Sequence, residues 1–176
     1  MRLDGHRIAI LVAEGAEDLE FYVPYMRLLE EGADVITAAL EVKPLRGKNG
    51  LTIQPTATIA SLKEEELLGV VIPGGWAPDK LRRHKTVTDL VRNLDHAGKT
   101  IGIICHGGLV PISADVVRGH RATGSLGIKD DLVNAGATWV DEPAFRDGNQ
   151  VWGRVVEDIP AFCRHLVEAL TEAASR

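Results

Sequence analysis

The stretch "GKTIGIICHGGLVPI", residues 98–112, places one of only two cysteines at the end of an apolar run. Because "TIGII" lacks the alternation of a half-exposed strand, it predicts a parallel strand covered on both faces. Gly107 and Gly108 follow directly and lead into a segment that we expect to be helical. Cys105 is therefore predicted to lie on a tight strand-to-helix turn at the carboxyl edge of a sheet, where open α/β sheets carry their active sites.

This kind of turn also carries the nucleophile of α/β-hydrolases, because small neighbours permit a strained backbone that pushes the side chain out of the sheet. We expect the N–H groups at the start of the following helix to stabilise a Cys105 thiolate and to hold an oxyanion. A free cysteine can instead act as a small buried hydrophobe, which is our interpretation of Cys163 inside an amphipathic helix. For Cys105, position alone leaves both roles open.

The rest of the chain alternates strand and helix signals. The runs "RIAILVA" (residues 7–13) and "VVIPGG" (residues 70–75) predict further buried parallel strands. Helical periodicity covers residues 17–31, where Pro24 is expected to kink or divide the helix. The last helix is expected to have Asp158 as its cap and Pro160 in its first turn.

Two Gly-containing turns add hairpins to this pattern. Asn49-Gly50 and Asp147-Gly148 each separate extended stretches, and these dipeptides favour the positive φ angles of tight turns. The sequence therefore predicts an α/β fold, a three-layer sandwich with a mainly parallel central sheet and small antiparallel hairpin additions.

Composition limits the possible partners. A chain of 176 residues that is 45% hydrophobic is expected to form a single domain, residues 1–176. Its formal net charge is -5 and its basic residues are scattered, which argues against nucleic acid or a membrane surface as a partner. Because the chain has two cysteines, no signal sequence and no membrane-spanning run, we expect it to be cytoplasmic. The expected partner is a small molecule or a peptide.

Four segments together resemble the ThiJ/PfpI superfamily, specifically its PfpI-like branch: "AEDLEFYVPYMRLLEEGADV", "VVIPGGWAPDKLR", "IICHGG" and "GIKDDLVNAGATWVDEPAFRDGNQVWGR". The resemblance covers nearly the whole chain. It implies a flavodoxin-like sandwich of the class I glutamine amidotransferase type, a nucleophilic cysteine at the elbow, and subunits that pair as dimers or larger homo-oligomers.

The same resemblance assigns roles to individual residues. Cys105 matches the nucleophile, Glu17 in "GAEDLE" the acidic residue that contacts it, and His106 the base of PfpI-like peptidases. Gly75 and the N–H of His106 match the oxyanion hole. A carboxyl beside a thiolate is driven toward protonation and can then donate a hydrogen bond to sulfur. Glu17 can alternatively be a first-turn helix acid, His106 a packing or capping residue, and Gly75 a simple turn residue.

Three positions depart from the pattern of PfpI-like peptidases. Gly108 replaces the proline of "CHGP". Asp79 stands where such proteins supply a glutamate from the neighbouring subunit, which makes it a possible inter-subunit acid, and Trp76 lies on the same loop beside the expected pocket. Ser125 replaces an aromatic residue or histidine, so we expect a more open pocket.

The sequence lacks the residues that several other functions require. A class I glutamine amidotransferase needs a His-x-Glu motif, and no histidine has Glu two residues later. The histidines show no metal-ligand spacing and no loop suits a flavin phosphate, so neither metal nor cofactor is expected. Two classes remain: a cysteine-dependent enzyme on small carbonyl or amide compounds, of glyoxalase, deglycase or peptidase type, and a non-catalytic redox or stress-response protein whose Cys105 is oxidised to a sulfinate.

Overall fold

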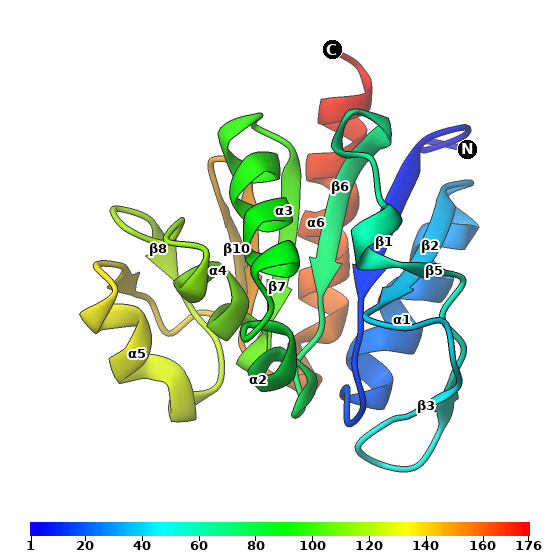
Figure 1. Cartoon of the computed structure of the whole chain (residues 1–176). Helices are drawn as coiled ribbons and strands as arrows, with labels where there is room; N and C mark the ends of the chain where they lie inside the picture. The colour runs from blue at the N-terminus through cyan, green and yellow to red at the C-terminus, as the bar shows by residue number, and fades with distance from the viewer.

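A seven-stranded sheet lies at the centre of the computed structural model, which describes residues 1–176 (Figure 1). In spatial order its strands are β10 (Ala144–Asp147), β11 (Gln150–Gly153), β7 (Thr100–Ile104), β6 (Leu67–Ile72), β1 (Arg7–Leu11), β2 (Asp34–Ala39) and β5 (Ala57–Thr58). Every neighbouring pair is parallel except β10 and β11. The order β2-β1-β6-β7-β11 is the doubly wound order of flavodoxin-like sheets, which confirms the predicted fold class.

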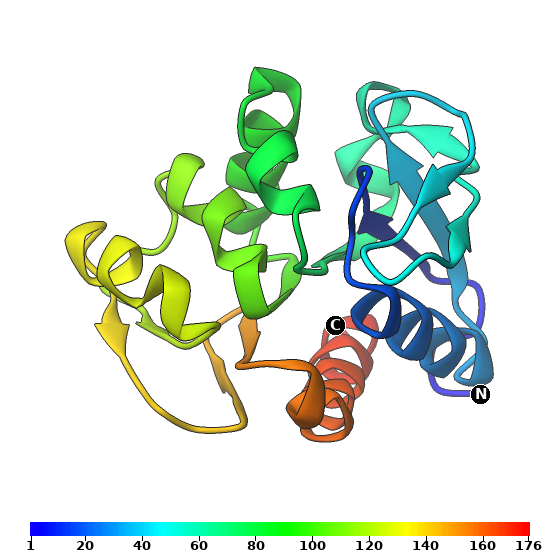
Figure 2. The same ribbon diagram turned by 90° about the horizontal axis from the view of Figure 1, so that it is seen from below.

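Helices cover both faces of this sheet, as the view in Figure 2 shows. The longest two, α1 (Asp18–Glu30) and α6 (Ile159–Ala174), pack together on one face. The other face carries α2 (Ala77–Leu81), α3 (Lys85–His96) and α4 (Leu109–Ser113), with α5 (Lys129–Asn134) beside α4. None of the helices has the length and apolar character that crossing a lipid bilayer requires.

Burial explains why the central strands read as continuous apolar runs. All five residues of β7 are buried, because helices cover both of its sides. Gly102 leaves room for α6, since a Cβ atom there would lie 2.9 Å from Leu166 Cδ1 and 3.1 Å from the ring of Phe162. The buried hydrophobic residues form one cluster of 48 across the two helical layers.

Three helical details differ from the sequence prediction. Pro24 does not divide α1, which runs unbroken from Asp18 to Glu30 with Pro24 among its buried residues. Asp158 occupies the cap position of α6 but makes no capping hydrogen bond, because its carboxylate pairs with Arg154 at 2.9 Å. The segment after Cys105 forms only a 3-10 turn (Cys105–Gly108) followed by the five residues of α4.

Both predicted hairpins are present. The strands β3 (Leu45–Arg46) and β4 (Thr52–Ile53) flank Asn49-Gly50 as a separate antiparallel pair, and β10 and β11 flank Gly148. A further small pair, β8 (Arg121–Ala122) with β9 (Thr138–Trp139), is parallel.

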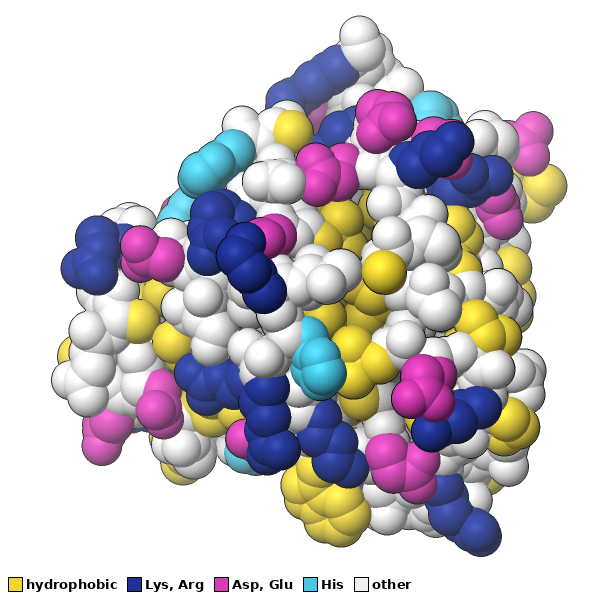
Figure 3. Space-filling view, in the orientation of Figure 1, with side chains coloured by type: hydrophobic (Ala, Val, Ile, Leu, Met, Phe, Trp, Pro, Cys, Tyr) yellow, Lys and Arg dark blue, Asp and Glu magenta, His cyan; other side chains and the backbone are white.

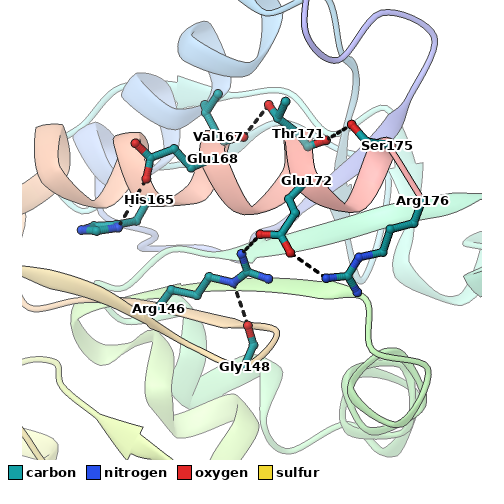
Figure 4. Close-up of polar contacts among 9 residues, drawn as sticks. All are labelled: Arg146, Gly148, His165, Val167, Glu168, Thr171, Glu172, Ser175 and Arg176. Carbon is teal, nitrogen blue, oxygen red and sulfur yellow. Dashed lines mark hydrogen bonds and ion pairs between the residues drawn. The ribbon is translucent and has the colours of Figure 1, made fainter.

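The β10–β11 hairpin is attached to the last turns of α6 (Figure 4). Arg146 donates to the carboxylate of Glu172 and, through Nε, to the carbonyl oxygen of Gly148 at 2.7 Å. Glu172 also accepts from Arg176 at 2.7 Å. The hairpin therefore extends the parallel sheet by one antiparallel strand that is held against the C-terminal helix.

Candidate active site

Cys105 lies on a strained elbow directly after β7. Its φ angle is +59°, and Asp115 is the only other non-glycine residue with a positive φ. Such a conformation costs an L-residue about 1 to 3 kcal/mol and is concentrated at functional sites. Gly107 makes the turn possible, because a Cβ atom there would lie 2.3 Å from the carbonyl oxygen of Ile72. The strained strand-to-helix turn predicted from the sequence is present.

The Cys105 side chain opens into a cavity of about 330 Å³. This thiol cavity lies at the carboxyl edge of the sheet, and loops after β1, β7 and β11 contribute to its wall. Its lining residues are Glu17, Glu20, Lys48, Gly75, Trp76, Cys105, His106, Ser125, Val155, Val156 and Glu157. The structure therefore brings together six of the residues that the sequence singled out and leaves Asp79 outside.

The carboxyl group beside the thiol belongs to Glu20, and this corrects the assignment of that contact to Glu17. The Glu20 side chain is fully buried in the first turn of α1, and it interacts with Cys105 by hydrogen bonding and by charge. Its Oε2 accepts from the N–H of Gly74 at 2.7 Å, while Oε1 has no nitrogen or oxygen partner. Glu20 is the residue that sequence reasoning missed.

Glu17 has a different set of partners. It is the N-cap of α1, and its Oε2 accepts from the backbone N–H of Glu20 at 2.8 Å. Its Oε1 accepts from Asn49 Nδ2 at 2.9 Å, in the loop between β3 and β4. A capping carboxylate points back at its own helix, so Glu17 lines the cavity but orients the helix end rather than the sulfur. The alternative reading of Glu17 as a helix-start acid describes its position.

The two groups of the Cys105–Glu20 pair affect each other's protonation. Burial raises the pKa of Glu20 to about 7, partly offset by the hydrogen bond from Gly74. Burial and then the charge of Glu20 raise the pKa of Cys105 to about 12, although the N–H of His106 acts in the opposite direction. The expectation of a thiol pKa lowered by a helix end is therefore wrong, since the following helical segment is short and desolvation dominates.

His106 flanks the sulfur on the other side. Its Nδ1 lies 3.4 Å from Cys105 Sγ, so the neighbouring residues do bring imidazole and thiol together. Partial burial, followed by the nearby positive charge of Lys48, lowers the pKa of His106. The imidazole is therefore neutral at neutral pH and able to accept a proton.

Two residues with candidate backbone N–H donors, Gly75 and His106, line the thiol cavity. The N–H of His106 interacts with the Cys105 sulfur, and Gly75, with φ of +73°, uses its N–H in no backbone hydrogen bond. A Cβ atom on Gly75 would lie 2.4 Å from the carbonyl oxygen of Gly15. The glycine is thus required for the loop to approach, and its N–H remains free beside the thiol cavity.

Of the remaining predicted residues, two line the thiol cavity and one, Asp79, does not. Ser125 lines the thiol cavity, donates its N–H to the Cys105 carbonyl at 3.3 Å and accepts from Gly127. Trp76 also lines the cavity and is 59% exposed. Asp79 is exposed on α2 and pairs with Arg83. No group of three or more His, Cys, Asp or Glu side chains is arranged to hold a metal ion.

Known proteins match most of this chain. Residues 6–169 match the model of the DJ-1/PfpI family, and the chain belongs to that family. It is 39% identical over 164 residues to a deglycase of Pyrococcus horikoshii, with 93% of this chain and 99% of the relative covered. It is 34% identical over 167 residues to protein/nucleic acid deglycase 2 of Escherichia coli, with 93% and 97% covered.

A solved structure has the same fold. The chain superposes with a TM-score of 0.92 and 35% identity on a two-domain protein of Anabaena variabilis that contains DJ-1/ThiJ/PfpI-like and ferritin-like domains. The match covers 94% of this chain and 48% of that protein, so the chain spans about half of its length.

Proposed function

We propose that the protein is a cysteine-dependent enzyme acting on small carbonyl or amide compounds, of the deglycase or glyoxalase type. The observation that carries this proposal is the left-handed Cys105, held between the carboxyl of Glu20 and the imidazole of His106 in an open cavity. A purely structural cysteine needs neither a strained backbone nor two proton acceptors. Relatives named deglycases support the same class.

The proposed reaction begins with transfer of the thiol proton. Glu20 is the stronger base, because its pKa is about 7 whereas that of His106 lies below the ordinary histidine value. The proton passes from sulfur to Glu20, which removes the charge repulsion and leaves an O–H that can donate to the thiolate. His106 is the alternative acceptor. The thiolate then forms a bond to the carbonyl carbon as the C=O electron pair moves onto oxygen.

The resulting oxyanion lies within reach of two proposed donors, the N–H of Gly75 and that of His106, which match the oxyanion hole of the family. Glu20 returns its proton to the leaving nitrogen or oxygen as that bond breaks and the C=O bond re-forms, which leaves a thioester on Cys105. Water then hydrolyses this thioester, and the products are the carboxylic acid and the free Cys105 thiol. Trp76 and Ser125 form the pocket wall around the substrate.

Assembly belongs to this proposal. Asp79 lies outside the cavity of its own chain, so it would have to reach the site of a neighbouring subunit, as the resemblance implies. We therefore expect at least a homodimer in the cytoplasm. Light scattering that shows only a 19.0 kDa species at micromolar protein would contradict a shared site.

An activity panel of dicarbonyls, amides and peptides tests the proposal. Wild type should consume at least one class, Cys105→Ala none, and Cys163→Ala, which alters a buried cysteine of α6, should retain activity. Turnover of peptides alone would favour the peptidase alternative. Absence of all turnover, together with stable oxidation of Cys105 to a sulfinate, would favour the redox or stress-response alternative.

A further inference from the structure

A second cavity, of about 460 Å³, adjoins the thiol cavity. The two share Lys48 and Trp76 as lining residues, so they meet at these side chains. Three basic residues line this second cavity, namely Arg46, Lys48 and Lys80, against one acidic residue, Glu14. Figure 3 shows Lys and Arg side chains gathered along the lower edge of the molecule beside an exposed hydrophobic side chain.

These three basic residues have no carboxylate partner. None of them forms an ion pair, although acidic residues outnumber basic ones 25 to 20 in the chain. Glu14 accepts from backbone N–H of Arg46 at 3.1 Å, and its carbonyl oxygen accepts from Lys80 at 2.9 Å. The cavity therefore has an excess of positive charge available to a ligand.

The loop that carries Lys48 is held in place by its neighbours. Asp18, almost fully buried, accepts from the N–H groups of Asn49 at 2.6 Å and Leu51 at 2.8 Å. The N–H of Lys48 donates to the carbonyl of Ala16 at 2.8 Å. Because the backbone is fixed before a ligand arrives, binding needs little further ordering of this loop.

Lys48 also acts electrostatically on the thiol cavity. Its positive charge lowers the pKa values of Glu20, Cys105 and His106. Its Nζ lies 5.9 Å from the ring centre of Trp76, which places a cation and an aromatic surface at the junction of the two cavities.

We propose that this second cavity is a subsite for an anionic group of the substrate, a carboxylate or a phosphate, bound by Lys48 together with Arg46 and Lys80 while the reactive carbonyl lies over Cys105. The inference rests on the proposed function and narrows its substrate class to carbonyl compounds that carry a negative charge at the end remote from the reacting carbon. Trp76 packs against the part of the substrate that joins the two groups.

Matched substrates test the subsite through turnover. The hemithioacetals of methylglyoxal with N-acetylcysteine and with N-acetylcysteine amide share a reacting centre and differ by one carboxylate. Wild type should favour the carboxylate in kcat/KM, and Lys48→Gln should reduce that preference by about 10-fold or more, since it removes a charge-assisted hydrogen bond. The preference is the ratio of the two kcat/KM values, so any effect of Lys48 on the chemical step, which both substrates share, cancels.

Lys129 provides the matched control. It lies 5.9 Å from the ring centre of Trp139, lines neither cavity and is also unpaired, so Lys129→Gln should leave the preference unchanged. An equal preference in wild type and Lys48→Gln, or an equal change in Lys129→Gln, would overturn the proposal.

Equilibrium binding separates the subsite from the chemistry. Cys105→Ala protein is titrated with methyl phosphate, acetate and acetamide at constant ionic strength, and the amide signals of residues 46–50 are followed by NMR. Shifts with either anion but not with acetamide support the subsite. The anion that causes the shifts shows whether the subsite binds a phosphate or a carboxylate. Such shifts without any turnover would refute only the proposed function, whereas turnover of both hemithioacetals with no anion-specific shift would refute only the subsite.

Discussion

Glu17 and Glu20 are one helical turn apart and have the same side chain, yet the structure uses them differently. Glu17 accepts from the N–H of Glu20, which leaves Glu20 free to extend toward Gly74 and Cys105. The pattern Glu-x-x-Glu at a helix start could have signalled this, because the N-cap side chain is normally occupied by its own helix. The partner of Glu20 lies more than 50 residues away, and nothing local in the sequence specifies it.

Removal of the Glu20 charge should lower the pKa of Cys105. Ionised Glu20 raises the thiol pKa by repulsion, and Glu20→Gln removes that charge while keeping the shape. We expect a fall of about one pKa unit or more, measured by thiolate absorbance with Cys105→Ser as the blank. Glu17→Gln is the control and should change the pKa less; an unchanged or higher thiol pKa in Glu20→Gln would contradict repulsion of the thiolate by ionised Glu20.

The buried Glu20 should also make folding pH-dependent. Its pKa is raised from 4.5 to about 7, so the folded state retains a proton that the unfolded state has already lost between these values. This contribution is fully present below pH 4.5 and disappears as the pH rises through 7, a loss of about 3 kcal/mol in the free energy of unfolding.

Urea unfolding of wild type and Glu20→Gln at pH 5 and pH 8 measures this contribution, because the difference between the two proteins cancels other titrating groups. The variant should gain stability relative to wild type as the pH rises. An unchanged difference between the two pH values would mean that Glu20 has an ordinary pKa in the folded protein.

Among the elements, the loop between β3 and β4 is anchored by one buried side chain, that of Asp18. Both carboxylate oxygens of Asp18 accept backbone N–H groups from this loop, and a Cβ atom on Gly47 would lie 2.3 Å from Asp18 Oδ1. Asp18 therefore connects the start of α1 to the loop that carries Lys48.

Asp18→Asn should release this loop. The amide keeps one acceptor and turns an NH₂ group toward a backbone N–H, so we expect a loss of about 1 to 3 kcal/mol in the free energy of unfolding and faster hydrogen exchange at Asn49 and Leu51. Asp130→Asn, in the exposed first turn of α5, is the matched control. Unchanged exchange at Asn49 and Leu51 would show that the loop is held by its other contacts alone.

The elements that are determined by residues close together in the sequence could be predicted from it. The uninterrupted run of β7 and the small residues after Cys105 indicated the elbow, and the Asn-Gly and Asp-Gly dipeptides indicated both hairpins. The unbroken course of α1 through Pro24 could not be predicted from the sequence. The buried face of α1 packs against α6 and the sheet, and this packing outweighs the one backbone hydrogen bond that Pro24 removes. α4 ends at Ser113 because Asp115, just beyond its C-cap, adopts a left-handed φ angle of +56°, which an aspartate does not by itself specify.

At the scale of the whole molecule, the core joins both helical layers through the sheet. Phe162, fully buried in α6, packs against Gly102 of β7 and Gly153 of β11. Phe162→Ala should cost about 3 to 5 kcal/mol in the free energy of unfolding, since it leaves a cavity between α6 and the sheet.

Leu126→Ala is the control for Phe162→Ala, because Leu126 is 76% exposed and should change stability by less than about 0.5 kcal/mol. Circular dichroism and tryptophan fluorescence should report the same transition for all three proteins. Separate transitions would mean that the two helical layers unfold independently.

The two borders of the central sheet affect how the protein behaves when it is concentrated. One border, β5, has only two residues, and the other, β10, has four, of which Arg146 is engaged with Glu172 on α6. Long, flat and apolar strand edges are the templates on which foreign chains add and fibrils grow. Here β5 is protected by its short length, and β10 by its short length, by the charge of Arg146 and by its contact with α6, so addition of a foreign chain at either border is disfavoured.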